Sequence, residues 1–320
     1  MTAEEMIQWV AEKVTDAAPE HIAALGRFIG ETTREYVDRF PFEIVQNADD
    51  ACLRAPDPPD GKPHRVRFDV FDDADGPALY FSNTGVPFSR EDLHRLYFVA
   101  LSEKQRGETI GYKGMGFKSV FQISETPQLF SDLGSELLSV GFSREHSLES
   151  YRSLRVESGK ADRQTFTRLF KTPADMPPFV PLRLTDDGET LSGVFERVEA
   201  LLELGFVNVF RFPLADRGDT TRILALSGHG MAASLLFLAR VRELELAFDG
   251  ERAFHAVVSV GDFPFSAVPK GARSCRLSLR ADPPPFAEGM LRFHYPLRAA
   301  SEDVHWILFS ETVRRRFETD

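Results

Sequence analysis

Two short segments, residues 41–51 and 110–121, constrain what this chain can fold into more than any other part of its sequence. The first carries apolar residues at helical spacing together with a carboxylate and an amide on one face. The second is rich in glycine and precedes an expected helix, so its backbone can approach phosphate groups closely. Between them, residues 83–88 end an expected strand with a polar turn. In combination the three segments predict a nucleotide pocket that is built without a P-loop.

Three polar residues of the first segment share one helix face. Glu43, Asn47 and Asp50 are spaced i, i+4 and i+7, which places them on one side of an α-helix. The amide oxygen of Asn47 is a hard ligand suited to Mg²⁺, and a glutamate one turn earlier can orient or deprotonate an attacking water. A surface helix would also carry such a polar stripe, so the spacing by itself does not identify a site.

The second segment contains Gly111, Gly114 and Gly116 ahead of the expected helix. Glycines let the backbone approach phosphates, and the N-terminus of the following helix adds N–H donors and a favourable dipole. The alternative is an ordinary flexible loop. The segment has neither the Gly-x-x-x-x-Gly-Lys-Ser/Thr pattern of a P-loop nor the strand-linked glycines of a dinucleotide-binding fold.

Lysine usage favours the phosphate-binding interpretation. The chain has 38 lysines and arginines, and only eight of them are lysines. Lys104, Lys113 and Lys118 nevertheless fall in or near the glycine-rich segment. A lysine carries a compact, flexible positive charge that suits a phosphate group. This local enrichment therefore favours phosphate binding over a simple loop.

The strand-end turn begins with Asn83 and continues through Thr84 to Gly85. A side-chain amide at the end of a strand can hydrogen-bond the edge of a base, and a glycine two residues later lets the base approach the backbone. An ordinary turn would have the same composition. The turn gains meaning only in combination with the other two segments.

Taken together, these residues resemble the GHKL ATPase superfamily, which includes ninety-kilodalton heat-shock chaperones, the ATPase subunit of DNA gyrase, MutL and histidine kinases. Residues 42–51 are similar to the Glu-Leu-Ile-Gln-Asn-Ala-Asp-Asp-Ala helix of its sacsin-type, chaperone-like branch. Residues 110–121 resemble the second glycine box of that branch, and residues 210–214 resemble its closing strand. The resemblance covers roughly residues 25–215, and the order and spacing of the set are more specific than any single motif.

The resemblance implies a role for each matching residue. Glu43 would be the general base, Asn47 the Mg²⁺ ligand and Asp50 a hydrogen-bonding partner near the sugar or base. Asn83 would lie under the adenine, and Gly85 would line the base pocket. The phosphate cradle and a lid over residues 89–110 would supply the remaining contacts: Ser102, Lys104, Gly111, Lys113, Gly114, Met115, Gly116, Phe117 and Lys118.

Two positions depart from the family pattern. The family usually has an aspartate where this chain has Asn83, and it often has a threonine where Asn208 falls. An asparagine can still accept a hydrogen bond from the adenine amino group, although it carries no charge. We therefore expect adenine preference to survive in a weaker form, while the Glu43–Asn47 pair needed for hydrolysis is unaffected.

The implied fold is α+β. A two-layer α/β sandwich, the Bergerat-type ATP-binding fold, is expected over residues 1–225. A smaller α/β extension, similar to the start of a transducer-like domain, is expected over residues 226–320. The patterns predict helices over residues 4–29 with a break near Pro19, 36–55 with Pro41 near the true start, 89–97 behind a capping box, from 117 onward, 188–204, 231–240 and 310–320. They predict strands over residues 66–70, 78–82, parts of 126–142 and 164–184, 208–214, 243–248, 257–260, 274–279 and 290–295.

Bulk composition excludes several classes of protein. The net charge is −11, which argues against a broad basic surface for duplex DNA. Two cysteines provide no disulfide framework, so a reducing, cytoplasmic setting is expected. The acidic N-terminus has no apolar signal core, and we find no run of apolar residues long enough for a transmembrane helix.

The leading functional expectation is a Mg²⁺-dependent module that binds ATP, hydrolyses it slowly and closes its lid, driving a conformational change in a larger protein or assembly. The alternative is a nucleotide-gated binding or dimerisation module with negligible ATPase activity. A histidine-kinase-like phosphotransferase is disfavoured because the eight histidines are scattered and no helical His-Glu phosphoacceptor segment precedes the pocket. A scaffold that binds no nucleotide is the least specific alternative. Expected partners are ATP, further domains or proteins, and a second copy of the chain when nucleotide is bound.

Overall fold

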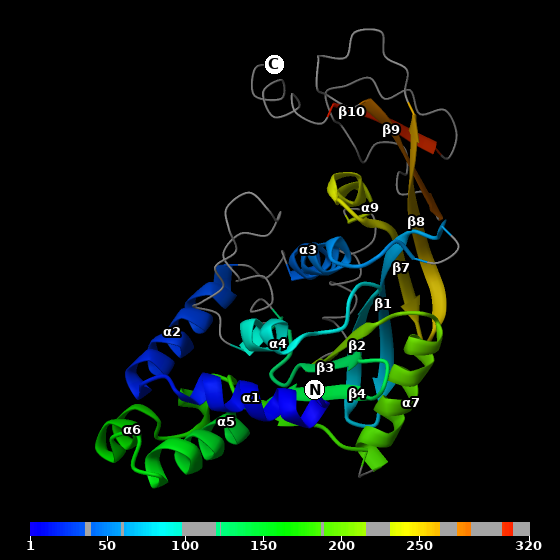
Figure 1. Cartoon of the computed structure of the whole chain (residues 1–320). Helices are drawn as coiled ribbons and strands as arrows, with labels where there is room; N and C mark the ends of the chain where they lie inside the picture. Colours follow the sequence, from blue (N-terminus) through cyan, green and yellow to red (C-terminus); the bar gives the residue numbers. More distant parts are fainter. Residues whose placement is uncertain are drawn as a thin grey trace.

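A single mixed sheet organises the chain (Figure 1). The computed structural model describes residues 1–35, 40–58, 61–97, 120–121, 123–186, 189–215, 231–262, 274–282 and 303–309. The ten strands lie in the order β10-β9-β8-β7-β1-β2-β6-β3-β4-β5. Their bounds are β1 His64–Asp73, β2 Gly76–Asn83, β3 Gln128–Asp132, β4 Leu137–Phe142, β5 Pro181–Arg183, β6 Asn208–Pro213, β7 Val241–Phe248, β8 Glu251–Asp262, β9 Ser274–Asp282 and β10 Asp303–Phe309. Neighbouring strands are antiparallel except β1 and β7, which are parallel.

The helices are distributed unequally over the two faces of this sheet. Their bounds are α1 Ala3–Thr15, α2 Pro19–Glu35, α3 Phe40–Leu53, α4 Arg90–Tyr97, α5 Arg144–Tyr151 continued by the π-helix η5 Arg152–Glu157, α6 Arg163–Leu169, the 3-10 turn η6 Pro173–Asp175, α7 Glu189–Glu203, α9 Met231–Ser234 and the 3-10 turn η8 Leu235–Phe237. Among the described residues, none of the helices combines the length and apolar character needed to cross a bilayer.

The first face of the sheet carries the larger core. Alternate residues of β2 and β6, such as Phe81, Phe210 and Phe212, point to this face, as the two-residue period of a strand requires. Helix α3 packs on the same face over β1 and β7, and its Phe40 ring meets the Phe212 ring of β6 edge-on at a centroid distance of 5.4 Å. Val45 of α3 is also buried in this cluster. The apolar stripe of α3 thus sets which of its sides points away from the sheet.

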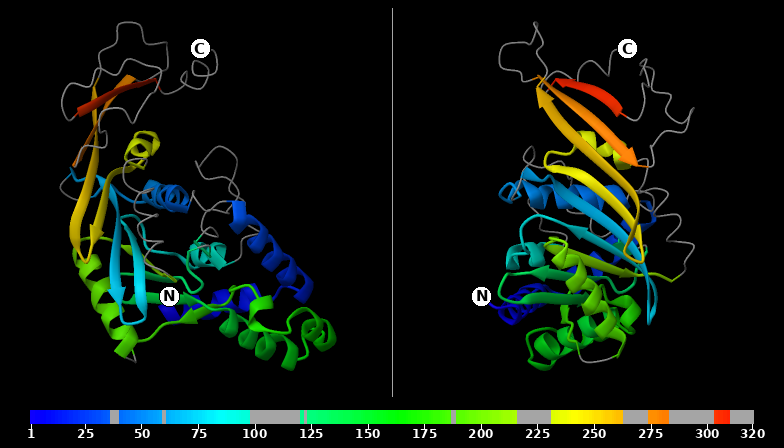
Figure 2. Two further views of the ribbon diagram at one scale, coloured as in Figure 1. Left: turned by 180° about the vertical axis from the view of Figure 1, so that it is seen from behind. Right: turned by 90° about the vertical axis from the view of Figure 1, so that its right-hand side faces the viewer.

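The second face is covered in part by one helix, α7. Val194, Val198 and Leu201 of α7 form a separate buried cluster with Tyr80 of β2 and Val209 of β6. Figure 2 shows α7, in green, on the side of the sheet opposite to α3, in blue. The α+β sandwich predicted from the sequence is therefore confirmed, with one helix added on the second face.

Local sequence signals place several helix starts correctly. Ser89 caps α4, because its Oγ accepts from the Asp92 N–H at 3.1 Å while the Asp92 carboxylate accepts from the Ser89 N–H at 3.2 Å. Pro41 lies in the first turn of α3, where its missing N–H costs nothing. The break near Pro19 separates α1 from α2 as predicted.

The prediction of strands within residues 164–184 is mostly wrong. Helix α6 and the turn η6 occupy most of this range, and only β5 is a strand. Asp162 caps α6 by accepting from the Thr165 N–H at 2.6 Å, and the buried Phe166 and Phe170 are four residues apart, which is a helical spacing. The predicted helix over 231–240 is shorter than expected, since it consists of α9 and η8.

Several other predictions lie outside the described residues: the start of the helix predicted from residue 117 onward, the strand over 290–295, the helix over 310–320 and the domain boundary near 225. Strand β7 begins after that boundary and pairs with β1, so the extension continues the same sheet. The division of the chain at residue 225 remains a prediction.

Arg211 of β6 is fully buried on the second face of the sheet. Its Nε donates to the Asp73 carboxylate at 2.6 Å, its Nη1 donates to Gln128 Oε1 at 3.3 Å, and its Nη2 pairs with Asp75. The Tyr80 hydroxyl also donates to Asp73, at 2.8 Å. The guanidinium thereby ties the end of the β1–β2 hairpin to β6 and β3.

Replacing Arg211 with Met should destabilise the protein by about 3 kcal/mol or more, because the buried Asp73 carboxylate loses one of its two arginine partners and Asp75 loses its ion pair with Arg211. The measurement is the free energy of unfolding from urea titrations followed by circular dichroism. Arg163→Met, at an exposed position of α6, is the matched control and should change stability by less than about 0.5 kcal/mol. Equal effects of the two variants would contradict a structural role for Arg211.

Candidate functional site

Helix α3 presents a polar side next to its buried one. Six of its apolar residues and Asp49 are buried: Phe40, Pro41, Ile44, Val45, Ala48, Asp49 and Cys52. Glu43, Asn47 and Asp50 are half-buried instead, so they share a side of the helix that remains partly accessible. The structure therefore gives these three predicted residues the common face that their spacing requires.

The turn after β2 lies against the C-terminal half of α3. The Cys52 thiol donates to the Thr84 carbonyl at 3.0 Å. A Cβ added to Gly85 would lie 3.4 Å from the Ala51 Cβ and 3.1 Å from the Asn83 Nδ2. Glycine is therefore the residue that lets this turn approach the helix. Two of the three segments singled out in the sequence are in contact.

Asn83 and Asn208 lie opposite each other on β2 and β6 and are both buried on the α3 side of the sheet. The Asn83 Nδ2 donates to the Thr84 carbonyl at 3.1 Å, so its amide is turned toward the strand-end turn. Asn83 is 2% exposed. A direct contact with a base would therefore involve only the edge of its amide.

Asn208 holds the segment that follows the turn. Its Oδ1 accepts from the Ser131 hydroxyl at 2.7 Å, and its Nδ2 donates to the Val86 carbonyl at 3.0 Å. The Ser131 Oγ in turn accepts from the Phe88 N–H at 2.9 Å. This network fixes residues 86–88 on the sheet and explains an asparagine at position 208. Sequence reasoning did not find Ser131, since nothing in its local pattern distinguishes it.

Residues 98–119, which form most of the glycine-rich segment and of the expected lid, lie outside the described residues. The predicted contacts that fall there are Ser102, Lys104, Gly111, Lys113, Gly114, Met115, Gly116, Phe117 and Lys118. Both flanks of this segment meet the same residue of β4, because Phe142 stacks on Tyr97 at a centroid distance of 4.1 Å and contacts Phe121 at 5.7 Å. Both flanks are thus anchored on the face of the sheet that carries α3.

Helix α4 also approaches α3 through an ion pair. Arg54, just after α3, donates to Asp92 of α4 at 2.9 Å, and the Asp92 side chain is 12% exposed. The pair is half in solvent, so its contribution to stability is small. The ion pair instead holds the end of α3 next to α4, which forms the start of the expected lid.

His64 connects the turn to the start of β7. Its Nε2 lies 3.4 Å from the Arg240 Nη2, and its Nδ1 lies 3.2 Å from the Thr84 Oγ1. Thr84 Oγ1 accepts from the Arg65 N–H at 3.0 Å. Burial, together with the nearby Arg240, lowers the pKa of His64 below its ordinary value.

Elsewhere in the described residues, Glu243, Glu245 and His255 bring three potential metal ligands together on β7 and β8. Arg67 lies 3.2 Å from the Glu245 carboxylate, and His255 is 2.8 Å from Glu243. These contacts already satisfy the ligand atoms with protein partners. The predicted Mg²⁺ ligand Asn47 is not part of this group.

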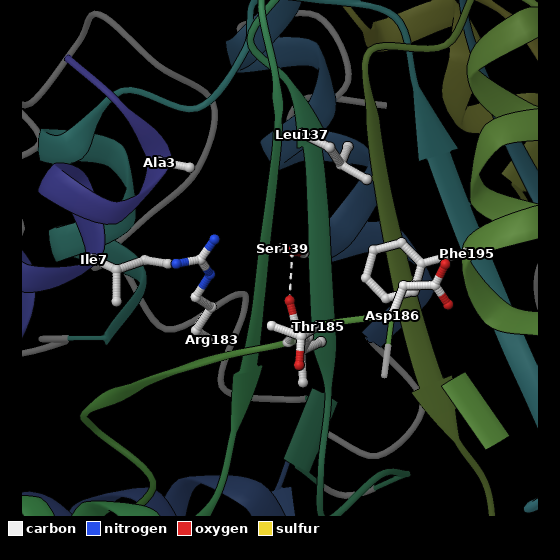
Figure 3. Close-up of a pocket in the computed structure, with 9 residues that line it drawn as sticks. Ala3, Ile7, Leu137, Ser139, Arg183, Thr185, Asp186 and Phe195 are labelled. Atoms are coloured by element: carbon white, nitrogen blue, oxygen red, sulfur yellow. Dashed lines mark hydrogen bonds between the residues drawn. The ribbon is translucent and has the colours of Figure 1, made fainter. Parts of the chain in front are cut away.

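A separate cavity of about 210 Å³ lies at the β5 edge of the sheet (Figure 3). Two of its polar side chains are engaged within the protein: the Ser139 hydroxyl donates to the Leu184 carbonyl at 2.9 Å, and Arg183 pairs with Glu4. Strands β6, β3 and β4 separate β5 from β2. The cavity is therefore distinct from the α3 site and contains none of the predicted residues.

The Cys52 thiol should be unreactive in the folded protein. Burial raises its pKa to about 12, so only about one thiol in ten thousand is ionised at pH 8. We expect iodoacetamide to leave Cys52 of a Cys275→Ser variant unmodified for hours, and to modify it readily in urea. Alkylation of the native variant at the rate of a free cysteine, measured by mass spectrometry, would contradict the burial of this side chain.

Stability should fall in mild acid because of His64. Its native pKa lies below the unfolded value of about 6.5, so the unfolded state binds more protons and stability is lost as the pH falls from about 6.5 toward the native pKa. Each unit of pKa difference corresponds to about 1.4 kcal/mol. Urea unfolding at pH 7.5 and pH 5.5 should show a smaller difference for His64→Asn than for the wild type.

His94 and His146 also have lowered pKa values because of burial, so they supply the pH dependence that the His64→Asn variant retains. His21→Asn is the control, because this residue is exposed on α2. If the free energy of unfolding of His64→Asn changed with pH as much as that of the wild type, the pKa of His64 would be the same in the folded and unfolded states.

Part of the chain matches a known protein family. Residues 23–171 match the family described as the sacsin domain. No curated protein matches the chain. The matched region covers just under half of the chain and includes α3, the turn after β2 and the glycine-rich segment. Over this region the chain is similar to sacsin domains.

Proposed function

We propose that this chain is a GHKL-type module that binds ATP with Mg²⁺ and hydrolyses it slowly. The observation that carries the proposal is the contact between the turn at Gly85 and helix α3, whose polar side carries Glu43, Asn47 and Asp50. The similarity of residues 23–171 to the sacsin domain supports it.

The chemistry of the α3 side chains fits a magnesium nucleotide. The Asn47 amide oxygen is a neutral, hard ligand, and Mg²⁺ keeps several waters and takes its other ligands from phosphates. When bound, the ion would neutralise charge on the β- and γ-phosphates. Glu43, one turn earlier and half-buried, would orient or deprotonate the attacking water. Asp50, one turn later, would hydrogen-bond near the sugar or base.

The strand-end turn would hold the base. The amide of Asn83 lies beside Gly85, where the backbone approaches α3, so a planar ring could lie along the turn with its polar edge toward Asn83. An asparagine offers both a donor and an acceptor, which allows it to bind adenine without the charge of an aspartate. We therefore propose adenine selectivity that is real but weaker than an aspartate would give.

The phosphates would be held by the glycine-rich segment. Main-chain donors at Gly111, Gly114 and Gly116, together with Lys113 and Lys118, would stabilise the charge that develops on the γ-phosphate. Met115 and Phe117 would contribute their backbone N–H groups, and Ser102 and Lys104 would contact phosphate from the lid. Anchoring of both flanks at Phe142 supports a segment that closes over α3.

Replacing Glu43 with Gln should leave ATP affinity within about threefold of the wild type, because a water-activating residue contributes little to ground-state binding. Phosphate release should fall at least about 100-fold. Calorimetric titration with a non-hydrolysable ATP analogue and Mg²⁺, beside a steady-state phosphate assay, measures both quantities. Asn47→Ala should instead weaken binding in Mg²⁺ and abolish the difference between titrations with and without the ion.

Glu12→Gln, on the exposed side of α1, is the control for loss of a carboxylate. It should leave ATP affinity and the rate of phosphate release unchanged. Equal hydrolysis by the wild type and Glu43→Gln would remove Glu43 from the mechanism. Tight binding by the wild type without any turnover would favour the second function, a nucleotide-gated binding or dimerisation module. No binding of ATP by the wild type would refute the proposal altogether.

A further inference from the structure

Asp49 of α3 binds the backbone of a segment far away in the sequence. Its Oδ1 accepts from the N–H groups of Arg240 and Val241, both at 2.7 Å, and its Oδ2 accepts from the Ala239 N–H at 2.8 Å. The side chain is 1% exposed. Hydrogen bonds to a buried carboxylate are stronger than those between neutral groups. Three such bonds on one residue make a firm connection between α3 and residues 239–241.

The connection joins the proposed site to the start of the sheet extension. Asp49 lies within one helical turn of Asn47 and Asp50, and a helix moves as a unit over such a distance. Residues 239–241 lead into β7, which pairs in parallel with β1 and antiparallel with β8. Any displacement of this part of α3 would therefore act directly on the first residues of β7.

The side chain of Arg240 adds a second connection from the same segment. Its guanidinium donates to the Asp57 carboxylate at 2.7 Å and lies 3.4 Å from the Nε2 of His64. The Nδ1 of His64 lies 3.2 Å from the Oγ1 of Thr84, in the turn that contacts α3. Both walls of the proposed site, the helix and the strand-end turn, are thus linked to residues 239–241.

We propose that Asp49 is a positioning residue that couples the α3 site to the extension that begins with β7. Binding of a nucleotide beside Asn47 and Asp50 would shift α3, and Asp49 would carry that shift to residues 239–241. Arg240 and His64 would do the same for the turn. The inference rests on the proposed function for the identity of the ligand. It goes beyond that function by assigning the route by which occupancy reaches the extension.

The test is hydrogen exchange followed by mass spectrometry on the full chain, comparing wild type with Asp49→Asn. The amide keeps one oxygen but presents a donor to the N–H groups, so the amides of residues 239–241 should exchange at least about tenfold faster without nucleotide. Asp69→Asn is the matched control. That carboxylate is also 1% exposed, but it accepts from the Gly250 N–H at 3.3 Å, at the other end of β7.

Addition of a non-hydrolysable ATP analogue with Mg²⁺ should slow exchange along β7 in the wild type and in Asp69→Asn. In Asp49→Asn this response should disappear, and nucleotide affinity should fall at least about fivefold, because coupling between two sites is reciprocal. If the role of Asp49 were only structural, Asp49→Asn would speed hydrogen exchange in the absence of nucleotide, but the analogue would still slow exchange along β7. That result would overturn the coupling.

Failure of the proposed function has a different signature. If calorimetry shows no binding of the analogue to the wild type, both the function and the coupling are refuted, whereas normal binding with an intact response in Asp49→Asn refutes the coupling alone. If Asp49→Asn does not fold, the same measurement is made on Arg240→Gln. This variant loses the contacts of the guanidinium with Asp57 and His64 but keeps the backbone N–H that donates to Asp49. Its response along β7 should be smaller than that of the wild type, and an equal response would overturn the proposal.

Discussion

Packing of the apolar side of α3 on the sheet, over β1 and β7 and against Phe212 of β6, decides on which side of the helix the described residues of the candidate site lie. Phe40 against Phe212, with Val45 in the same cluster, sets the rotation of the helix about its axis. Once that rotation is set, Glu43 and Asn47 must point away from the sheet. The close approach of the turn at Gly85 depends on the same packing, because Ala51 is the helix residue that the glycine meets.

Buried polar groups give this arrangement its specificity. Asn208 and Ser131 hold residues 86–88, and Asp49 holds residues 239–241. An apolar core alone would tolerate small shifts of these segments, since hydrophobic contacts have no preferred direction. Hydrogen bonds to buried groups allow only one position, because a misplaced partner leaves a desolvated polar atom. These hydrogen bonds therefore restrict the positions of α3 and of the strand-end turn more tightly than apolar packing alone would.

The sheet extension changes how the proposed function is understood. Strand β7 lies in parallel beside β1, so the extension shares the sheet that carries the site. A conformational change that begins at α3 does not have to cross a flexible linker to reach β7. This continuity suits a module that passes on its nucleotide state, whether or not it turns over many ATP molecules.

The sequence by itself determined the helix containing Glu43, Asn47 and Asp50, their common face and the β1–β2 hairpin, because these depend on local periodicity and turn residues. The α+β class came from the family resemblance, and the structure confirms it. The tertiary structure decided what local patterns do not contain: the strand order and the partners of Asn208. The neighbours Asp49 and Asp50 show the reason. Helical geometry separates their directions, but Asp49 is buried because residues 239–241, distant in sequence, supply its three hydrogen bonds.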